Sequence, residues 1–164
     1  MTAHAGPVQL DVPTPEAMHD LGRRLAAMLR AGDLVVLTGD LGAGKTTLTR
    51  GVGEGLGVRG QVTSPTFVLA RVHPATAGGP PLVHVDAYRL TTFAEVDDLD
   101  LDASLDDSVT VVEWGEGRVE DLAESRLEVT LRRARDAHDE HRAVTVRGLG
   151  PRWSVGDLAR LLAP

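Results

Sequence analysis

Apolar residues recur at helical spacing close to the start of the chain. Thr14 followed by Pro15 is typical of an N-cap and a first helical residue. The apolar positions that then fall on one helical face are Met18, Leu21, Leu25, Met28 and Leu29. Gly32 is suited to ending a helix. The pattern predicts a helix that begins at Pro15, ends at Gly32 and turns its apolar stripe toward the core.

Short apolar runs predict strands at residues 8–12, 34–37, 68–72, 82–85 and 109–112. The 34–37 run is bounded by polar and glycine residues, which is typical of a strand buried on both faces. Residues 127–131 and 143–146 alternate apolar and polar positions and predict a hairpin with one solvated face. Further helices are expected over 45–56, after the capping-box pair Thr92 and Glu95, and from Ser154 to near Leu162. Strands that alternate with helices indicate an α/β layered sandwich, mostly parallel at its centre.

Composition and charge restrict the class of protein. The 164 residues suit a single domain, and the formal net charge of −7 is the wrong sign for a chain that grips nucleic acid by itself. We expect a partner to hold most of any nucleic acid. No run of 18 apolar residues occurs, and the first eleven residues do not resemble a signal peptide, so cytoplasmic residence is expected. With no cysteine, thiol catalysis and cysteine-ligated zinc are excluded.

The distribution of basic residues singles out one position. Sixteen of the seventeen basic residues are arginine, and the remaining one is Lys45. An arginine fork is too large to replace a compact ammonium inside a tight phosphate loop. The single lysine therefore stands where the chemistry does not tolerate arginine.

That lysine lies in a phosphate-loop motif. Residues 39–46 read GDLGAGKT and match G-x-x-x-x-G-K-[ST] at every fixed position, between a predicted buried strand and a predicted helix. Glycines let main-chain N–H groups turn toward phosphate oxygens, and the helix N-terminus adds unsatisfied donors. Lys45 is expected to reach the β- and γ-phosphates, and the Thr46 hydroxyl to ligate Mg²⁺. The sequence predicts a nucleoside triphosphate site.

Two carboxylates are candidates for the metal side of that site. Asp86 ends the 82–85 run and Glu113 ends the 109–112 run, and ligands of parallel sheets gather at the carboxyl ends of strands. The sequence does not rank the two. The acidic residues from Glu95 to Asp107 are expected to form a solvated or partner-facing surface. An EF-hand is excluded because Ala103 replaces its required glycine and Val109 its bidentate glutamate.

Four motifs in sequence order resemble the TsaE (YjeE) family, the small bacterial ATPases of tRNA threonylcarbamoyladenosine synthesis. They are GDLGAGKTTLTRG from Gly39, SPTF from Ser64, HVDAYRL from His84 and EWGE from Glu113. The resemblance implies a P-loop NTPase three-layer sandwich with a mostly parallel central sheet and added antiparallel strands. It also implies slow Mg-ATP hydrolysis beside the partners TsaB and TsaD, which modify an adenosine next to the anticodon. The chain has no asparagine, so it lacks the usual guanine-selecting tetrad, and adenine is the expected base.

The family also implies roles for individual residues. Lys45, Asp86 and Glu113 would be catalytic, and Thr46, Asp86 and Glu113 would face the metal. Thr66 resembles a switch residue that senses the γ-phosphate, and Trp114 would lie near the nucleotide or in the core. The residues expected to contact the nucleotide are Thr14, Gly42, Ala43, Gly44, Lys45, Thr46, Thr47 and Arg142. Thr14 and Arg142 would lie on the base side.

Two segments depart from the pattern expected of relatives, the longer hairpin tip at 132–141 and the tail around Trp153. Arginines at the tip suggest a tRNA or partner contact, whereas the adjacent acids favour a mixed, solvated turn. Two other functions are compatible with the loop: a small-molecule kinase, although no convincing arginine-bearing lid is visible, and a module that binds nucleotide without hydrolysing it.

Overall fold

The computed structural model describes residues 5–40, 42–58, 70–76, 78–86, 105–113, 123–136, 138–153 and 158–159, apart from the side chains of residues 5, 6, 70 and 86. Its elements, in chain order, are β1 (Ala5–Val12), α1 (Pro15–Ala26), β2 (Leu34–Gly39), α2 (Lys45–Leu56), β3 (Ala70–His73), β4 (Leu82–Asp86), β5 (Val109–Glu113), β6 (Arg126–Arg133) and β7 (Arg142–Leu149). The described strands form one seven-stranded sheet in the order β1-β7-β6-β2-β5-β4-β3.

The centre of the sheet is parallel and its flanks are antiparallel. Strands β6, β2, β5 and β4 run in one direction, while β7, β1 and β3 are antiparallel to their neighbours. Every residue of β5 is buried, as are five of the six residues of β2, as expected for strands covered on both faces. The predicted α/β fold with a mostly parallel centre and added antiparallel strands is confirmed.

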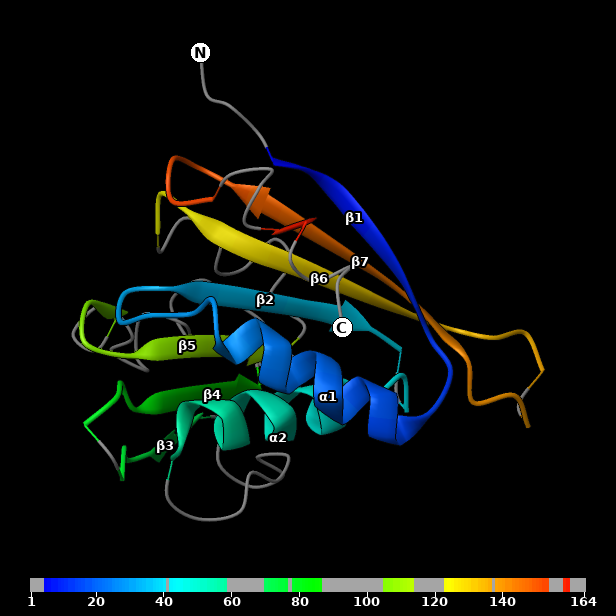
Figure 1. The fold of residues 1–164 in the computed structure, drawn as a ribbon, viewed down its shortest axis with the longest axis horizontal. Coiled ribbons are helices and arrows are strands. Elements are labelled where there is room, and N and C mark those ends of the chain that lie inside the picture. Colours follow the sequence, from blue (N-terminus) through cyan, green and yellow to red (C-terminus); the bar gives the residue numbers. More distant parts are fainter. Residues whose placement is uncertain are drawn as a thin grey trace.

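Helices α1 and α2 lie side by side over one face of the sheet (Figure 1). The two helices approach so closely that a Cβ on Gly22 of α1 would collide with the main-chain oxygen of Leu48 on α2. Beneath them, aliphatic side chains of β2, β5, β6 and β7 join the buried face of α1 in one core cluster. This packing therefore holds the start of α2, and with it the phosphate loop, against the sheet.

Helix α1 begins where the sequence predicts and ends earlier. Thr14 Oγ1 accepts a hydrogen bond from the Ala17 N–H at 3.1 Å, so the N-cap is confirmed. The predicted end at Gly32 is wrong, because the helix ends at Ala26. Tight main-chain bonds take over there, from Met28 N–H to Leu25 O and from Leu29 N–H to Ala26 O. The chain must turn within a few residues to enter β2, and this turn overrides the apolar periodicity.

The remaining predicted elements agree with the structure where it describes them. Helix α2 has the predicted bounds, and β6 and β7 form the predicted hairpin. Strand β3 begins at Ala70, and the first residues predicted for it lie outside the described ranges, as do the helix near Thr92 and most of the one from Ser154. No helix within the described ranges is long and apolar enough to cross a membrane.

The segment after β7 is fastened to the core. Trp153 is buried within the core cluster, and the Arg152 guanidinium lies over its ring, 4.1 Å from the centroid. Arg152 Nε donates to Asp33 Oδ1 at 3.0 Å, and Asp33 itself is buried just before β2. The tail around Trp153 thus closes the amino-terminal edge of the central strands, the edge remote from the phosphate loop.

Candidate nucleotide site

The phosphate loop connects the end of β2 to the start of α2. Gly44 is the N-cap of α2 and has a φ of +110°, a left-handed conformation that favours glycine. A Cβ at this position would lie 3.2 Å from Met18 Cε. Within the described ranges no side chain hydrogen-bonds to this helix end, which is the arrangement expected where the first N–H groups of a helix face an anion. The predicted order of strand, loop and helix is confirmed, and Leu41 lies outside the described residues.

Lys45 is folded back across the loop that carries it. Its side chain is nearly buried, and Nζ donates to the main-chain oxygens of Gly39 at 2.5 Å and Asp40 at 3.1 Å. The ammonium is thus held at the mouth of the loop by the two residues that open it.

Glu113 lies beside the loop at the carboxyl end of β5. Strands β2 and β5 are parallel neighbours with Leu37 opposite Glu113, which places this carboxylate next to the start of α2. Thr46 Oγ1 is 3.5 Å from Glu113 Oε1, a long hydrogen bond, and Glu113 is only 4% exposed. The structure thus brings the predicted hydroxyl and one predicted carboxylate together.

Asp86 occupies the matching position on the next strand. It ends β4 directly opposite Glu113 in the parallel register, although its side chain lies outside the described set. Thr66 and Trp114 also lie outside the described residues, so their predicted switch roles remain predictions. Among the described residues, no group of three or more His, Cys, Asp or Glu side chains is placed to hold a metal.

No role is predicted from the sequence for His84, which the structure places beside Glu113. The ring lies on β4, two residues before Asp86, and is completely buried. Its Nε2 is 3.5 Å from Glu113 Oε1, and neither ring nitrogen has a hydrogen-bond partner among the described residues. A histidine inside the otherwise apolar 82–85 run is a signal in the sequence, but only the strand pairing reveals its neighbour.

A small pocket of about 150 Å³ opens on the other side of the loop. It is lined by Thr14, Pro15, Met18, Gly42, Ala43, Gly44, Thr47, Glu140 and Arg142. All the residues predicted for the base side and the outer part of the loop therefore meet at one cavity. Pro15, Met18 and Glu140 complete it and were not predicted. Larger hollows lie beside α1 near Arg23 and at the opposite edge of the sheet near Asp33, away from the phosphate loop.

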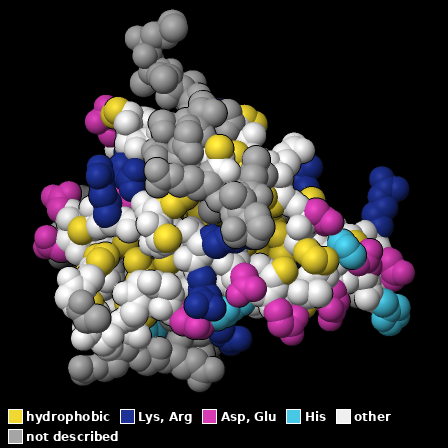
Figure 2. All heavy atoms as spheres, viewed as in Figure 1, with side chains coloured by type: hydrophobic (Ala, Val, Ile, Leu, Met, Phe, Trp, Pro, Cys, Tyr) yellow, Lys and Arg dark blue, Asp and Glu magenta, His cyan; other side chains and the backbone are white. Residues whose placement is uncertain are grey.

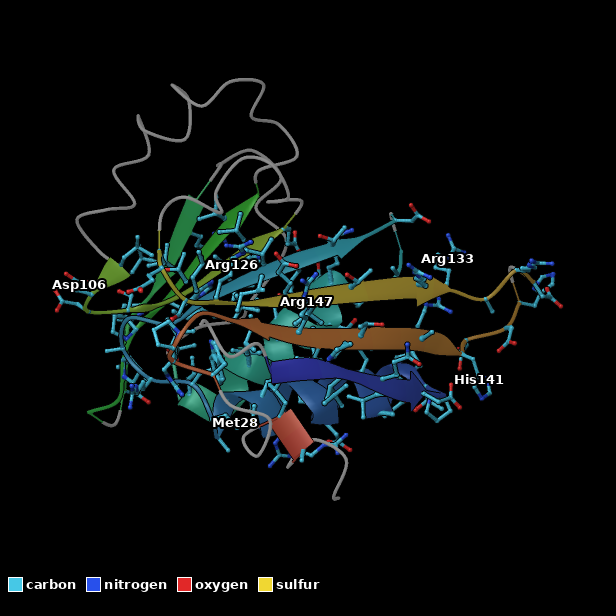
Figure 3. All side chains as sticks on the ribbon, turned by 90° about the horizontal axis from the view of Figure 1, so that it is seen from above. Met28, Asp106, Arg126, Arg133, His141 and Arg147 are labelled. Atoms are coloured by element: carbon cyan, nitrogen blue, oxygen red, sulfur yellow. The ribbon has the colours of Figure 1, made fainter. Side chains whose placement is uncertain are left out.

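Two arginines of the β6–β7 hairpin flank Gly42. Arg142 donates from one terminal nitrogen to the Gly42 carbonyl at 3.5 Å and from the other to Asp139 O and His141 O. The guanidinium of Arg133 lies 3.6 Å from the point that a Cβ on Gly42 would occupy. In Figure 3, Arg133 lies at the end of the sheet opposite Asp106, at the base of the hairpin tip. The hairpin thus contributes positive charge beside the loop.

The hairpin tip is exposed and carries charges of both signs. Figure 2 shows basic, acidic and histidine side chains together at the projecting end of the molecule, where β6 connects to β7. The Asp139 carboxylate accepts hydrogen bonds from the His141 N–H and from His141 Nδ1, both at 2.9 Å. The main-chain hydrogen bond, followed by the ring bond, lowers the pKa of Asp139. The tip is therefore the mixed, solvated turn favoured by its sequence.

Comparisons with known proteins show which family the sequence and the fold resemble. Residues 12–144 match the family model described as threonylcarbamoyl adenosine biosynthesis protein TsaE. The TsaE protein of Streptomyces coelicolor is 68% identical over 146 residues, which cover 88% of this chain and 99% of that protein. The TsaE of Bacillus subtilis is 38% identical over 142 residues, covering 86% and 85%. A crystal structure of Bacillus subtilis YdiB superposes with a TM-score of 0.73 at 30% identity, covering 99% of this chain and 96% of that one.

Proposed function

The chain belongs to the TsaE family of threonylcarbamoyl adenosine biosynthesis proteins, and from this premise we propose that it binds and slowly hydrolyses Mg-ATP. Hydrolysis would drive a conformational cycle in threonylcarbamoyl modification of tRNA, in the cytoplasm and beside the partners TsaB and TsaD. The observation that carries this proposal is the convergence of Lys45, Thr46 and Glu113 on the phosphate loop.

The donor set at the loop fits a magnesium ion bound together with phosphate. Magnesium prefers oxygen ligands, and in phosphate sites it takes one or two from the protein and the rest from phosphate and water. The Thr46 hydroxyl and the Glu113 carboxylate supply hard oxygens of this kind, 3.5 Å apart. Asp86, opposite Glu113 in register, is the second candidate carboxylate. Bound there, the ion would neutralise charge on the β- and γ-phosphates.

The chain's own residues would perform the remaining work electrostatically. The N–H groups of Gly42, Gly44 and the first turn of α2 would hold the phosphate oxygens. Lys45 would exchange its bonds to Gly39 O and Asp40 O for bonds to the β- and γ-phosphates. A carboxylate, Glu113 or Asp86, would orient the attacking water. None of these groups needs to form a covalent bond to phosphate.

The nucleoside would occupy the pocket that Thr14 and Arg142 share with the loop. A pocket of about 150 Å³ provides one enclosed wall for a base or ribose rather than a complete cavity for ATP. Thr14 Oγ1 accepts from the Ala17 N–H, and its O–H remains able to donate to the ligand. Arg142, anchored on the Gly42 carbonyl, would cover the ring.

Phosphate release provides the test of this proposal. The purified chain should release inorganic phosphate from ATP slowly in the presence of Mg²⁺, and faster when purified TsaB, TsaD and tRNA are added. Phosphate release that is independent of all three would contradict the coupling. Isotope-labelled ATP separates the kinase alternative, since a kinase would move the γ-phosphate to a small molecule. Tight ATP binding without any phosphate release would favour a binding module.

The switch hypothesis has a separate test. The chain contains two tryptophans, and Trp153 is buried at the remote edge of the sheet. In a Trp153→Phe background, fluorescence therefore reports on Trp114 alone. We expect a change in emission on adding ATP with Mg²⁺, and a smaller one with ADP if the 64–67 segment responds to the γ-phosphate. An unchanged emission would argue against a position of Trp114 near the nucleotide.

A further inference from the structure

We propose that His84 is a positioning residue for Glu113, whose carboxylate it holds in the orientation that faces Thr46. This inference rests on the proposed function and extends it to a residue below the nucleotide site. The contact joins His84 Nε2 to Glu113 Oε1, the same oxygen that faces Thr46 Oγ1. One carboxylate oxygen therefore lies between the Thr46 hydroxyl of the loop and a ring nitrogen of the neighbouring strand, each 3.5 Å away.

Strand pairing fixes this arrangement. Strands β4 and β5 are parallel, with Asp86 opposite Glu113 and His84 opposite Val111. Side chains two residues apart on a strand share a face, and so do residues paired in a parallel register, so His84, its partner Val111 and Glu113 lie on the same side of the sheet. Glu113 thus lies between the His84 ring of the neighbouring strand and the start of α2.

The environment of the ring argues against a purely structural role. His84 is completely buried, its ring nitrogens have no hydrogen-bond partner among the described residues, and its strand neighbours Val83 and Val85 are buried too. A buried N–H that lacks a hydrogen bond destabilises a fold relative to an apolar side chain of similar size. A leucine would therefore suit this position at least as well as histidine for packing alone.

The chemistry of a carboxylate explains what the ring contributes. The terminal torsion of a glutamate is broad and nearly two-fold, so packing alone orients it poorly. When the Thr46 hydroxyl turns to a ligand it no longer donates to Glu113, and His84 Nε2, 3.5 Å from Oε1, would then close to a hydrogen bond that holds this oxygen in place. Hydrogen bonds that orient a ligating group typically change metal affinity by about 10- to 100-fold when removed.

The test compares variants at His84 by nucleotide binding rather than by hydrolysis. A fluorescent, non-hydrolysable ATP analogue is titrated with Mg²⁺ and again with EDTA, and the ratio of the two dissociation constants measures the magnesium contribution. We expect His84→Leu to reduce that ratio about 10-fold while affinity in EDTA and the melting temperature stay at native values. His84→Gln, whose amide nitrogen can donate from the position of Nε2, should keep most of the ratio.

A second histidine provides the matched control. His73 is buried on β3, opposite Leu82 at the start of β4, and so lies at the far end of that strand from Glu113. His73→Leu should leave the magnesium contribution unchanged. If His84→Leu does not fold, His84→Gln and His84→Asn supply the comparison. The asparagine side chain is too short to reach Glu113, so His84→Asn should show a reduced magnesium contribution, whereas His84→Gln should keep most of it.

Several outcomes would overturn the inference. A folded His84→Leu variant with native magnesium dependence would show that the ring does not orient Glu113. Equal losses in the leucine and glutamine variants, or in the glutamine and asparagine variants, would assign the effect to packing. Nucleotide binding by the native chain that does not depend on magnesium at all would remove the proposed function together with this inference. Magnesium-dependent binding in the native chain, with the dependence reduced only in His84→Leu and His84→Asn, would support both the proposed function and this inference.

Discussion

The two edges of the parallel sheet each carry a buried carboxylate, but the hydrogen bonds around the two carboxylates differ in length. At the amino-terminal edge, Arg152 contacts both oxygens of Asp33 at 3.0 and 3.1 Å and the Met28 carbonyl at 2.7 Å. The Arg30 N–H donates to the same carboxylate at 2.8 Å. At the carboxyl-terminal edge, the polar atoms described next to Glu113, Thr46 Oγ1 and His84 Nε2, both lie at 3.5 Å.

The difference separates a stabilising site from a binding site. Short, charge-assisted bonds among Asp33, Arg152 and Arg30 use most of the hydrogen-bonding capacity of the carboxylate, so the cluster can do little except hold the tail on the core. Bonds of 3.5 Å leave Thr46 and Glu113 with capacity for other partners. Buried polar groups that are only loosely paired cost stability, and their presence at the loop fits a site shaped for a ligand.

The largest predicted effect is on the ligand-binding edge. Lys45→Ala removes charge-assisted bonds to two phosphates, each worth about 1.5–3 kcal/mol. The summed loss of about 3–6 kcal/mol should therefore lower the affinity for Mg-ATP by about 100- to 10,000-fold, with the fold intact. Isothermal titration calorimetry measures the loss and circular dichroism the fold. Micromolar ATP affinity in the variant would refute the assignment of the loop.

The next largest predicted effect is on stability and lies at the amino-terminal edge of the sheet. Arg152→Ala leaves the buried Asp33 carboxylate without its main partner and should lower the free energy of unfolding by about 3 kcal/mol. Urea denaturation measures this value. Mg-ATP affinity should not change, because Arg152 is remote from the loop. Arg147→Ala, an exposed arginine on β7, is the control and should leave both quantities near native values. A loss of affinity in Arg152→Ala would mean that the edges are coupled.

A smaller effect is expected from the wall of the base-side pocket. Arg142→Ala removes the guanidinium that bonds to Gly42 O and lines the pocket with Thr14. Because the side chain is partly exposed, its contribution should be about 1 kcal/mol, or about 5-fold in ATP affinity. Binding of inorganic triphosphate, which has no base, should change less. Equal losses for ATP and triphosphate would place Arg142 on the phosphates instead.

The smallest effect concerns pH at the hairpin tip. The pKa of Asp139 is lowered below its ordinary value of 3.8 by hydrogen bonds from His141. A carboxyl with a depressed pKa contributes stability above its unfolded-state pKa, and this contribution is lost as the pH falls through the folded value. An NMR titration should therefore give Asp139 a midpoint below 3.8, and His141→Ala should raise it. A midpoint at or above 3.8 in the native chain would contradict the hydrogen-bonded tip.

The parts of this molecule that local sequence determines could be predicted. The phosphate loop is contiguous, so its glycines, Lys45 and the bounds of α2 followed from one motif. The N-cap at Thr14 is equally local. The end of α1 could not be predicted in this way, because the tight turn from Ala27 toward β2 outweighs an apolar pattern that continues to Leu29.

Contacts between distant strands lay beyond the sequence pattern. Arg152 and Asp33 are 119 positions apart, and nothing local pairs one with the other. The neighbours of Glu113 depend on the order β2-β5-β4, which places His84 and Thr46 around it. The position of Arg133 against Gly42 likewise depends on β6 running beside β2. Tertiary pairing, rather than residue type, decides these contacts.

The central claim is that the 39–46 loop encloses a polyphosphate whose metal is held by Thr46. A crystal structure with Mg²⁺ and a non-hydrolysable ATP analogue tests it most directly. We expect the β-phosphate within the ring of loop N–H groups, the metal about 2.1 Å from Thr46 Oγ1, and Lys45 Nζ on phosphate oxygens. A collapsed loop with Lys45 still bonded to Gly39 O, or a nucleotide bound elsewhere, would contradict the account.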